Sequence, residues 1–349
     1  MDDLRLNVGL LRRKVPNLTS AARLVGLRPA TVSNLCTGKI PVGRAEVRTL
    51  AALASLANCT LDDLIIRGEK IEMIETKIKT LDLFAPLAKG GTVGLVARPG
   101  MGQLVVLAEL LYRLKQDGYQ TILLMPEGEH RGVDDLSENV DIITHSIGET
   151  SRKITELGGD QEMIFVADRT HVITGGIQEL QENLEDKGIH SVTTFLVDLT
   201  GDVVDENLPY GPLETLWQFD ADLVARHRYP AVSPLGSVSS VLEGAHLDQE
   251  HFAVQQKALK LLRRYRELRS LVAVGGIDRL PASELQTFRR GERLEAYLTQ
   301  PFYVTEAFTK KPGASVSLQE TLHDVKGIMN GAADSREVAE LELIGSLQS

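Results

Sequence analysis

The chain has 349 residues, of which 43% are hydrophobic and 25% charged, a composition typical of a globular protein with room for two domains. No apolar run approaches the roughly 18 residues needed to span a bilayer, and the acidic start MDDLRLNVGLLRRK is unlike a secretory signal. Cys36 and Cys59 form no C-x-x-C pair, which argues against a disulfide framework or zinc site, so we expect a cytoplasmic protein.

The net charge of −10 is unevenly distributed along the chain. Between Arg5 and Arg48 there are nine Lys or Arg residues and a single acid, Glu46, so the remaining chain holds the negative excess. A basic end on an acidic body indicates that the first segment meets a polyanion. The alternative is a basic surface that is merely solvated.

The first forty residues predict three short helices. The first carries Leu4, Val8 and Leu11 at helical spacing and ends before Pro16. Thr19 is placed to cap a second helix over 20–25, which stops at Gly26. Pro29 suits the first turn of a third helix that runs to about Thr37.

Two further helices are predicted before residue 70. The apolar face of the fourth comprises Val47, Leu50, Leu53, Ala54 and Ala57. Thr60 and Asp63 have the spacing of a capping box for a fifth helix that ends near Arg67.

The segment TSAARLVGLRPATVSNLCTGK, residues 19–39, has the form of a helix-turn-helix, with Gly26 at the turn and Val32 and Leu35 pointing inward. It resembles the phage-repressor type of helix-turn-helix domain, and CTLDDLI, residues 59–65, is similar to the closing helix of that family. The resemblance covers about residues 5–67.

This resemblance implies that the second helix of the motif enters the DNA major groove. Its outward residues are Arg28, Thr31, Ser33 and Asn34, of which Arg can read guanine and Asn adenine. Lys39 and Arg44 follow that helix and suit phosphates, which fix register without reading sequence. We therefore expect double-stranded DNA as partner and a homo-oligomer, from dimer to hexamer. A helical module for protein contacts is the alternative.

The rest of the chain predicts an α/β class. Apolar strands alternate with helical runs, which favours a mostly parallel sheet covered on both faces. The expected strands are 92–96, 121–125, 141–144, 163–167 and 193–197. From about Gln249 the chain becomes mainly helical. We expect three domains, at residues 1–68, 69–247 and 248–349.

Residues 97–104, ARPGMGQL, stand between an apolar run and a helical run, where a G-x-x-x-x-G-K-[ST] phosphate loop belongs. Gly100 and Gly102 still allow close backbone approach to a phosphate. Gln103 replaces the Lys and Leu104 the hydroxyl that binds Mg²⁺. The sequence therefore predicts a loop without its catalytic charge and metal ligand, in which Arg98 could supply a substitute cation.

Four longer segments resemble the catalytic beta subunit of the rotary ATP synthase. They are IETKIKTLDLFAPLAKGGTVGLV (74–96), RYPAVSPL (228–235), DQEHFAVQQKALKLLRRYRELRSLVAVGGIDRL (248–280) and LTQPFYVTEAFTKKPG (298–313). The resemblance covers about residues 74–331 and implies a RecA-like P-loop NTPase core. The N-terminal β-barrel of that family is absent, and the helix-turn-helix occupies its place.

Carried over residue by residue, the resemblance implies a nucleotide site. Asp198 matches the Mg²⁺-side Asp at the end of a strand, and Glu129 matches the Glu that orients water; both are relics of catalysis. The remaining residues would contact ATP or ADP: Arg98, Gly100, Gly102, Gln103, Tyr229 and Phe308. The alternatives are a strand-end acid at Asp198 and ordinary core residues at Tyr229 and Phe308. No His or Cys pattern predicts a metal site.

Three functions fit this sequence. The first is a DNA-binding transcriptional regulator with a catalytically inactive body for oligomerisation or nucleotide sensing. The second is a nucleotide-dependent ATPase acting on DNA. The third is a non-catalytic assembly subunit or scaffold, paired with a paralogous ATPase subunit. No membrane partner is expected.

Overall fold

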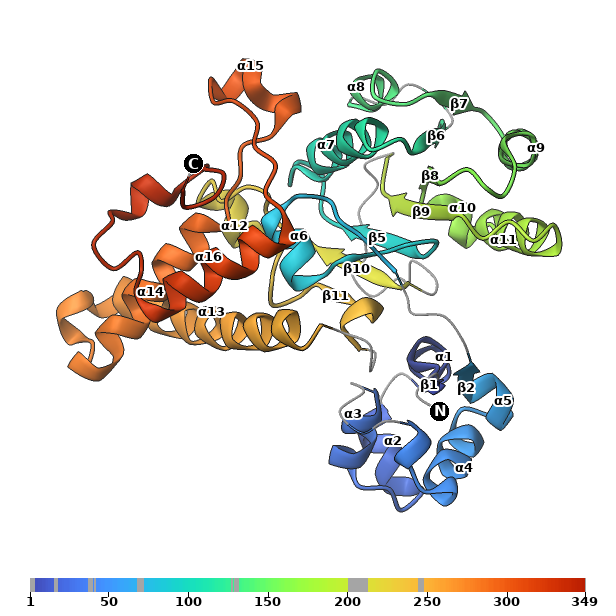
Figure 1. The fold of residues 1–349 in the computed structure, drawn as a ribbon, viewed down its shortest axis with the longest axis horizontal. Coiled ribbons are helices and arrows are strands. Elements are labelled where there is room, and N and C mark those ends of the chain that lie inside the picture. The colour runs from blue at the N-terminus through green and yellow to red at the C-terminus, as the bar shows by residue number, and fades with distance from the viewer. Residues whose placement is uncertain are drawn as a thin grey trace.

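The computed structural model describes residues 4–15, 18–36, 40, 42–67, 72–126, 128, 132–199, 213–243 and 248–348. Figure 1 shows a small helical unit, residues 4–67, and a larger unit that begins at residue 72 and holds the sheet. We call them the head and the body. In the described part of the chain, no helix is both long and apolar enough to cross a membrane.

The head contains the five expected helices. They are α1 (Val8–Lys14), α2 (Leu18–Leu24), α3 (Pro29–Cys36), α4 (Val47–Leu56) and α5 (Leu61–Leu64), with a 3-10 turn at Val42–Arg44. Leu11, Leu35 and Leu53 are almost fully buried at the centre of the core that joins them. The predicted capping box is confirmed: the Thr60 hydroxyl accepts the Asp63 amide, and the Asp63 carboxylate accepts the Thr60 amide.

Three details of the head differ from the sequence prediction. Leu4 is not helical, because it belongs to β1 (Leu4–Leu6) and the Asn7 side chain caps α1 by accepting the Leu10 amide. The fifth helix ends at Leu64, and the β-branched pair that follows continues as β2 (Ile65–Arg67), antiparallel to β1. Thr19 lies inside α2 rather than capping it. Pro16 and Thr37 fall outside the described residues.

The body is built on a seven-stranded sheet in the order β11-β10-β5-β9-β8-β6-β7. The five expected strands are present as β5 (Thr92–Val96), β6 (Gln120–Leu124), β7 (Ile142–Thr144), β8 (Met163–Asp168) and β9 (Val192–Val197). Neighbouring pairs are parallel apart from the antiparallel β10–β11 edge. The mostly parallel sheet is therefore confirmed. The sequence reading missed β10 (Thr215–Gln218) and β11 (Val238–Ser239).

Helices cover both faces of the sheet, as the alternation of strands and helices predicts. One face packs on α7 (Gln103–Gln116) and α8 (Val133–Ser137), and its core includes Leu123 and Val166. The other face packs on α9 (Ile147–Leu157) and α11 (Gly176–Asp186), and its core includes Ile122 and Phe165. The short helices α10 (Thr170–Ile173) and α12 (Ala221–Ala225) follow strands β8 and β10.

The expected helical C-terminal part forms a second core beside the sheet. Its helices are α13 (Gln249–Gly275), α14 (Ala282–Tyr297), α15 (Glu306–Thr309) and α16 (Leu318–Asn330), with 3-10 turns at Ser240–Glu243, Ile277–Arg279, Tyr303–Thr305 and Val338–Leu341. Leu83 and Phe84 of α6 (Lys79–Phe84) insert into this core. Strands β3 (Met73–Ile74) and β4 (Leu87–Ala88) flank α6 as a small antiparallel pair.

Candidate functional site

The α3 helix has the division of faces that DNA recognition needs. Val32, Leu35 and Cys36 are buried in the head. Arg28 and Ser33 are exposed, and Thr31 and Asn34 are half-buried. Gly26 makes the turn before α3 with φ +73°, a left-handed conformation that a side chain would strain, so α3 leaves α2 sharply.

Of the two residues predicted to contact phosphates, only Arg44 lies in the described part of the chain. Arg44 is exposed and closes the 3-10 turn Val42–Arg44, six residues beyond Gly38 in the chain. Lys39 lies outside the described residues. Of the residues expected to meet DNA, the described head therefore presents Arg28, Ser33 and Arg44 to solvent, with Thr31 and Asn34 partly accessible.

The phosphate-loop-like segment has the expected strand-turn-helix geometry. Strand β5 ends at Val96, and α7 begins at Gln103. Gly100 and Gly102 adopt φ +84° and +87°, which glycine alone tolerates without strain. The Met101 amide donates to the Arg98 carbonyl at 3.3 Å and closes the turn. Tyr229 stands beside it, since a Cβ on Gly102 would lie 3.9 Å from the Tyr229 ring.

The two positions at which a G-x-x-x-x-G-K-[ST] loop would carry Lys and a hydroxyl contribute to packing. Gln103 is only 6% exposed, and Leu104 is half-buried against the core beneath β5. A Cβ on Gly132 would lie 3.0 Å from the Leu104 Cδ1 atom, so Leu104 fills the space between α7 and the segment that leads into α8. These two positions hold a buried amide and an aliphatic side chain, neither of which is a cation or a metal ligand.

Two carboxylates lie at the ends of adjacent parallel strands. Asp198 follows β9 and is 4% exposed, as expected of a strand-end acid. Asp168 ends β8 and was missed, although the apolar run before it gave the same signal. Its oxygens accept the Thr170 amide at 2.8 Å and the Leu199 amide at 2.6 Å. Glu129 lies outside the described residues, which contain no cluster of metal-ligating side chains.

The two aromatic residues predicted to flank a base are both on the surface. Tyr229 is 38% exposed and Phe308 is 87% exposed, so the alternative that they are core residues is wrong. Phe308 belongs to α15, which projects from the top of the body in Figure 1. The Tyr229 carbonyl accepts the Gln300 amide at 3.0 Å, which ties Tyr229 to the chain that leads into α15.

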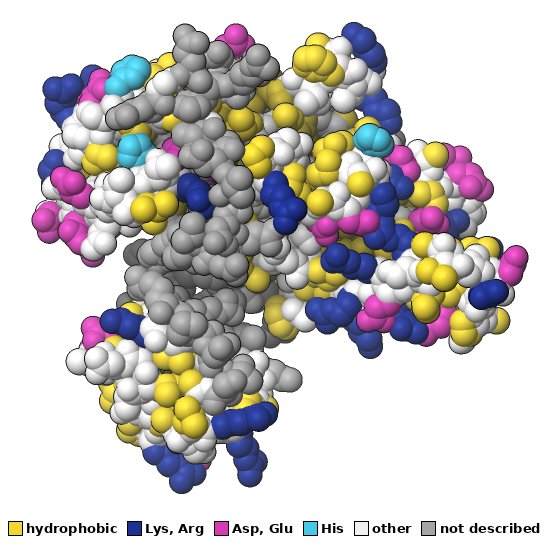
Figure 2. All heavy atoms as spheres, turned by 180° about the vertical axis from the view of Figure 1, so that it is seen from behind, with side chains coloured by type: hydrophobic (Ala, Val, Ile, Leu, Met, Phe, Trp, Pro, Cys, Tyr) yellow, Lys and Arg dark blue, Asp and Glu magenta, His cyan; other side chains and the backbone are white. Residues whose placement is uncertain are grey.

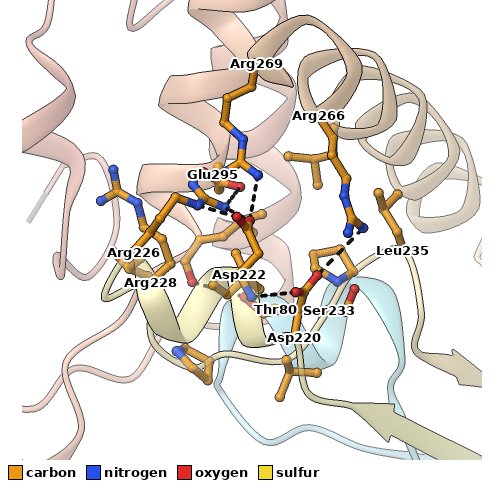
Figure 3. A pocket seen from close by; sticks show the side chains of 17 residues that line it. Thr80, Asp220, Asp222, Arg226, Arg228, Ser233, Leu235, Arg266, Arg269 and Glu295 are labelled. Atoms are coloured by element: carbon orange, nitrogen blue, oxygen red, sulfur yellow. Dashed lines mark hydrogen bonds and ion pairs between the residues drawn. The ribbon is translucent and has the colours of Figure 1, made fainter. Parts of the chain in front are cut away.

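A cavity of about 320 Å³ opens beside Arg98. The turn contributes one wall, and the facing residues are Gln218–Ala221, Ser233, Leu235, Gly236 and Arg266. The neighbouring pocket in Figure 3 shares Asp220, Ser233, Leu235 and Arg266 with it, and the sequence reading missed both.

A network of charged side chains forms one side of the pocket in Figure 3. Asp222 accepts hydrogen bonds from Arg226 and Arg269, each at 2.7 Å, and Arg226 also pairs with Glu295. Burial acts to raise the pKa of Asp222, but the two guanidinium groups outweigh it and hold the pKa below its ordinary value. These opposite charges compensate one another. We therefore interpret the network as a structural link between α12, α13 and α14 and not as a ligand-binding site.

Comparisons with known proteins agree with both parts of this picture. Residues 5–69 match the Cro/C1-type helix-turn-helix DNA-binding domain, and residues 242–334 match the C-terminal domain of V and A type ATP synthase. Among solved structures, the chain is similar to a unique ATP synthase subunit, NeqB, from Nanoarcheaum equitans. The identity is 15% and the TM-score 0.60, over 76% of this chain and 78% of that one, a likeness of fold.

The chain therefore carries, at residues 5–69, a segment that matches the Cro/C1-type helix-turn-helix DNA-binding domain, followed by an α/β body with the fold of an ATP synthase subunit, in which residues 242–334 match the C-terminal domain of V and A type ATP synthase.

Proposed function

We propose that the protein is a DNA-binding transcriptional regulator whose body is catalytically inactive and serves oligomerisation or nucleotide sensing. One observation carries the proposal. The head exposes Arg28, Ser33 and Arg44, whereas Gln103 and Leu104, which stand where a phosphate loop carries its Lys and hydroxyl, are packed into the body.

The DNA-binding half rests on α3. Arg28 and Asn34 offer the hydrogen-bond donors and acceptors that read guanine and adenine edges. A single head covers few base pairs, so useful affinity calls for two or more heads on one assembly. A homo-oligomer formed through the body would supply them, because linked heads gain avidity without any new contact.

The inactive body follows from the chemistry of phosphoryl transfer. That reaction depends on charge compensation around the γ-phosphate and on a metal ion, and little covalent work is left to the protein. Gln103 has no charge and Leu104 no ligand atom. Arg98 is the exposed cation of the turn and the candidate for holding a phosphate there.

Nucleotide sensing would use the surface around the turn. The backbone of Gly100 and Gly102, the Gln103 amide and the Arg98 side chain would meet the phosphates, and Tyr229 and Phe308 would meet the base. Residues on α15 and the turn come from different parts of the body, so a bound nucleotide would connect them.

The first experiment is a titration of labelled ATP and ADP into nucleotide-stripped protein, with and without Mg²⁺. Binding in the micromolar range, weakened in Arg98→Ala, supports a nucleotide sensor, and DNA affinity and oligomer size then need measuring in each ligand state. If no binding is found up to millimolar ligand, nucleotide sensing is excluded and oligomerisation is the remaining proposed role of the body.

The carboxylates at the ends of β8 and β9 favour one competing function, a nucleotide-dependent ATPase acting on DNA. Steady-state phosphate release with and without DNA distinguishes it. A DNA-stimulated rate that disappears in Glu129→Gln contradicts the inactive body. The scaffold function predicts instead that no sequence-selective DNA binding is found.

A further inference from the structure

One exposed face of α13 carries a row of cations at helical spacing. Lys257, Lys260, Arg263 and Arg264 line an open cleft of about 580 Å³ between α13 and α14. All four are exposed, and Leu261 is the one apolar residue among those lining the cleft. In Figure 2, Lys and Arg side chains, with Asp and Glu side chains among them, lie at the right of the molecule, over the region of α13 and α14.

The charge of α13 is opposite to that of the chain. The helix holds six Lys or Arg and two Glu, in a protein with a net charge of −10. Arg266 and Arg269 face the neighbouring segment that carries α12, where they pair with Asp220 and Asp222. Arg264 pairs with Glu267 and Glu284, each at 2.7 Å. These three cations therefore have structural partners.

The other three cations of α13 have no such role. Within the described part of the chain, no acidic side chain forms an ion pair with Lys257, Lys260 or Arg263, and none of the three is buried. We call these three residues the α13 stripe. They succeed one another every three residues, so they follow one side of the helix over roughly 9 Å at about 1.5 Å per residue.

We propose that the α13 stripe is a second, sequence-independent contact for the phosphate backbone of the DNA duplex that the head binds. The inference rests on the proposed function, since the head is what brings a duplex to this protein. Long flexible cations in a row neutralise successive phosphates without reading bases. An interface with an acidic protein would instead place apolar or aromatic anchors at its centre, and the cleft contains none but Leu261.

The test uses the full-length protein and a 60-base-pair duplex of random sequence. Binding is followed by fluorescence anisotropy across a series of salt concentrations. The stripe variant is Lys257→Gln/Lys260→Gln/Arg263→Gln. Its matched control, Arg152→Gln/Lys153→Gln/Lys187→Gln, removes the same charge from largely exposed positions on and next to α9 and α11.

Log affinity falls as log salt rises, and the steepness of that fall should decrease by about 2 to 3 in the stripe variant, at about 0.9 per lost phosphate contact. At low salt its affinity should fall at least tenfold, while the control stays close to wild type. Equal slopes in the stripe variant and the control would overturn the proposal. So would stripe-dependent binding of polyglutamate with DNA affinity unchanged, which would indicate an acidic protein partner.

A head variant, Arg28→Ala/Asn34→Ala, separates this proposal from the proposed function. If the head variant loses DNA and the stripe variant does not, the stripe proposal fails and the DNA-binding head stands. If only the stripe variant loses DNA, the body binds DNA without the head, and both the role proposed for the head and the stripe as a second contact fail. Loss in both supports the two together.

Discussion

The head and the body use the same residue types in opposite ways. In the head, Arg28, Arg44 and Arg48 are exposed, and the core beneath them is aliphatic. In the body, charged side chains lie inside the structure: Lys79, Asp82 and Glu109 have no exposed surface, and Arg113 is 4% exposed. Charges on the head can serve recognition, whereas these charges of the body hold segments together.

The buried charges of the body have specific partners. The Lys79 ammonium donates to the carbonyls of Tyr297, Ile344 and Gly345, which fixes the C-terminal segment. Arg113 pairs with Glu109 at 2.7 Å and donates to the Ala314 carbonyl, which fixes the chain after α15. We therefore expect that removing a buried charge from the body lowers the free energy of unfolding. Removing an exposed charge from the head should instead lower DNA affinity.

The largest effect is expected from Arg113→Ala. It leaves Glu109 buried without its cation, which should lower the free energy of unfolding by about 3–5 kcal/mol, as for other broken buried pairs. Denaturant unfolding of the body measures this, and DNA affinity under native conditions should not change.

The control for that prediction is Glu109→Gln/Arg113→Met, which removes both charges at similar volume. It should be more stable than the single variant, because no uncompensated charge remains. A double variant as unstable as Arg113→Ala would show that the lost hydrogen bonds, and not the orphaned charge, dominate.

The next effect concerns the head. Arg28→Ala and Asn34→Ala should each weaken binding to a selected DNA site by about 1–3 kcal/mol and relax its sequence preference. For Arg28→Ala the free energy of unfolding should change by less than about 0.5 kcal/mol, because Arg28 is exposed, and the unfolding of Asn34→Ala is measured alongside because Asn34 is half-buried. Arg48→Ala, whose side chain is 84% exposed on α4, is the matched control and should retain the sequence preference.

A smaller effect comes from the titration of Lys79. Burial lowers the pKa of this ammonium from 10.5 to about 7, although Asp324 acts in the opposite direction. Between pH 7 and 10.5 the unfolded chain holds a proton that the folded chain has lost. The free energy of unfolding should therefore rise with pH in that window, by at most about 1.4 kcal/mol per pH unit.

Lys79→Met isolates this contribution. The difference in the free energy of unfolding between wild type and variant should change with pH from 7 to 10.5 and be constant below and above that window. Burial also raises the pKa of Asp82, to about 7, but its effect falls below that window and is common to both proteins. Parallel curves for wild type and Lys79→Met would contradict the assignment.

The smallest effects come from the two capping boxes, one in each unit. Ser317 and Glu320 repeat on α16 the arrangement of Thr60 and Asp63 on α5. Thr60→Ala and Ser317→Ala should each cost about 1 kcal/mol. Calorimetry should assign the two losses to different transitions if head and body unfold separately, and Thr60→Ser should be nearly silent. A shift of both transitions by either variant would mean that the units unfold as one.

The parts of the fold that the sequence predicted are those with local signals. Strands such as 92–96 and 163–167 are apolar runs bounded by turns, and α3 has its Pro at the first turn. The three-residue strands β1 and β2 have no such signal, because each exists through pairing with a segment some sixty residues away. Strand β10, TLWQ, is short and mixed, so only its place beside β5 identifies it.

In the candidate site, too, some features could be predicted from local sequence and others depend on distant segments. The turn at Gly100 and Gly102 follows from residue type, because glycine is needed where φ is positive. The burial of Gln103 and Leu104, the cavity beside Arg98 and the network around Asp222 depend on α8, α13 and α14, which approach from elsewhere in the chain. Nothing local to residues 97–104 carries that information.

The short ladder between β1 and β2 has a mechanical consequence. It is reinforced by the Asn7 amide, which donates to the Leu64 carbonyl at 2.8 Å, and by the Asn7 side chain, which donates to the Asp63 carbonyl at 3.1 Å. Arg67 ends β2 and is the last described residue before the body, so it lies where the chain leaves the ladder. The turn between α2 and α3 is not part of this ladder, so tension applied along the chain at Arg67 would load the β1–β2 pairing before it loads that turn.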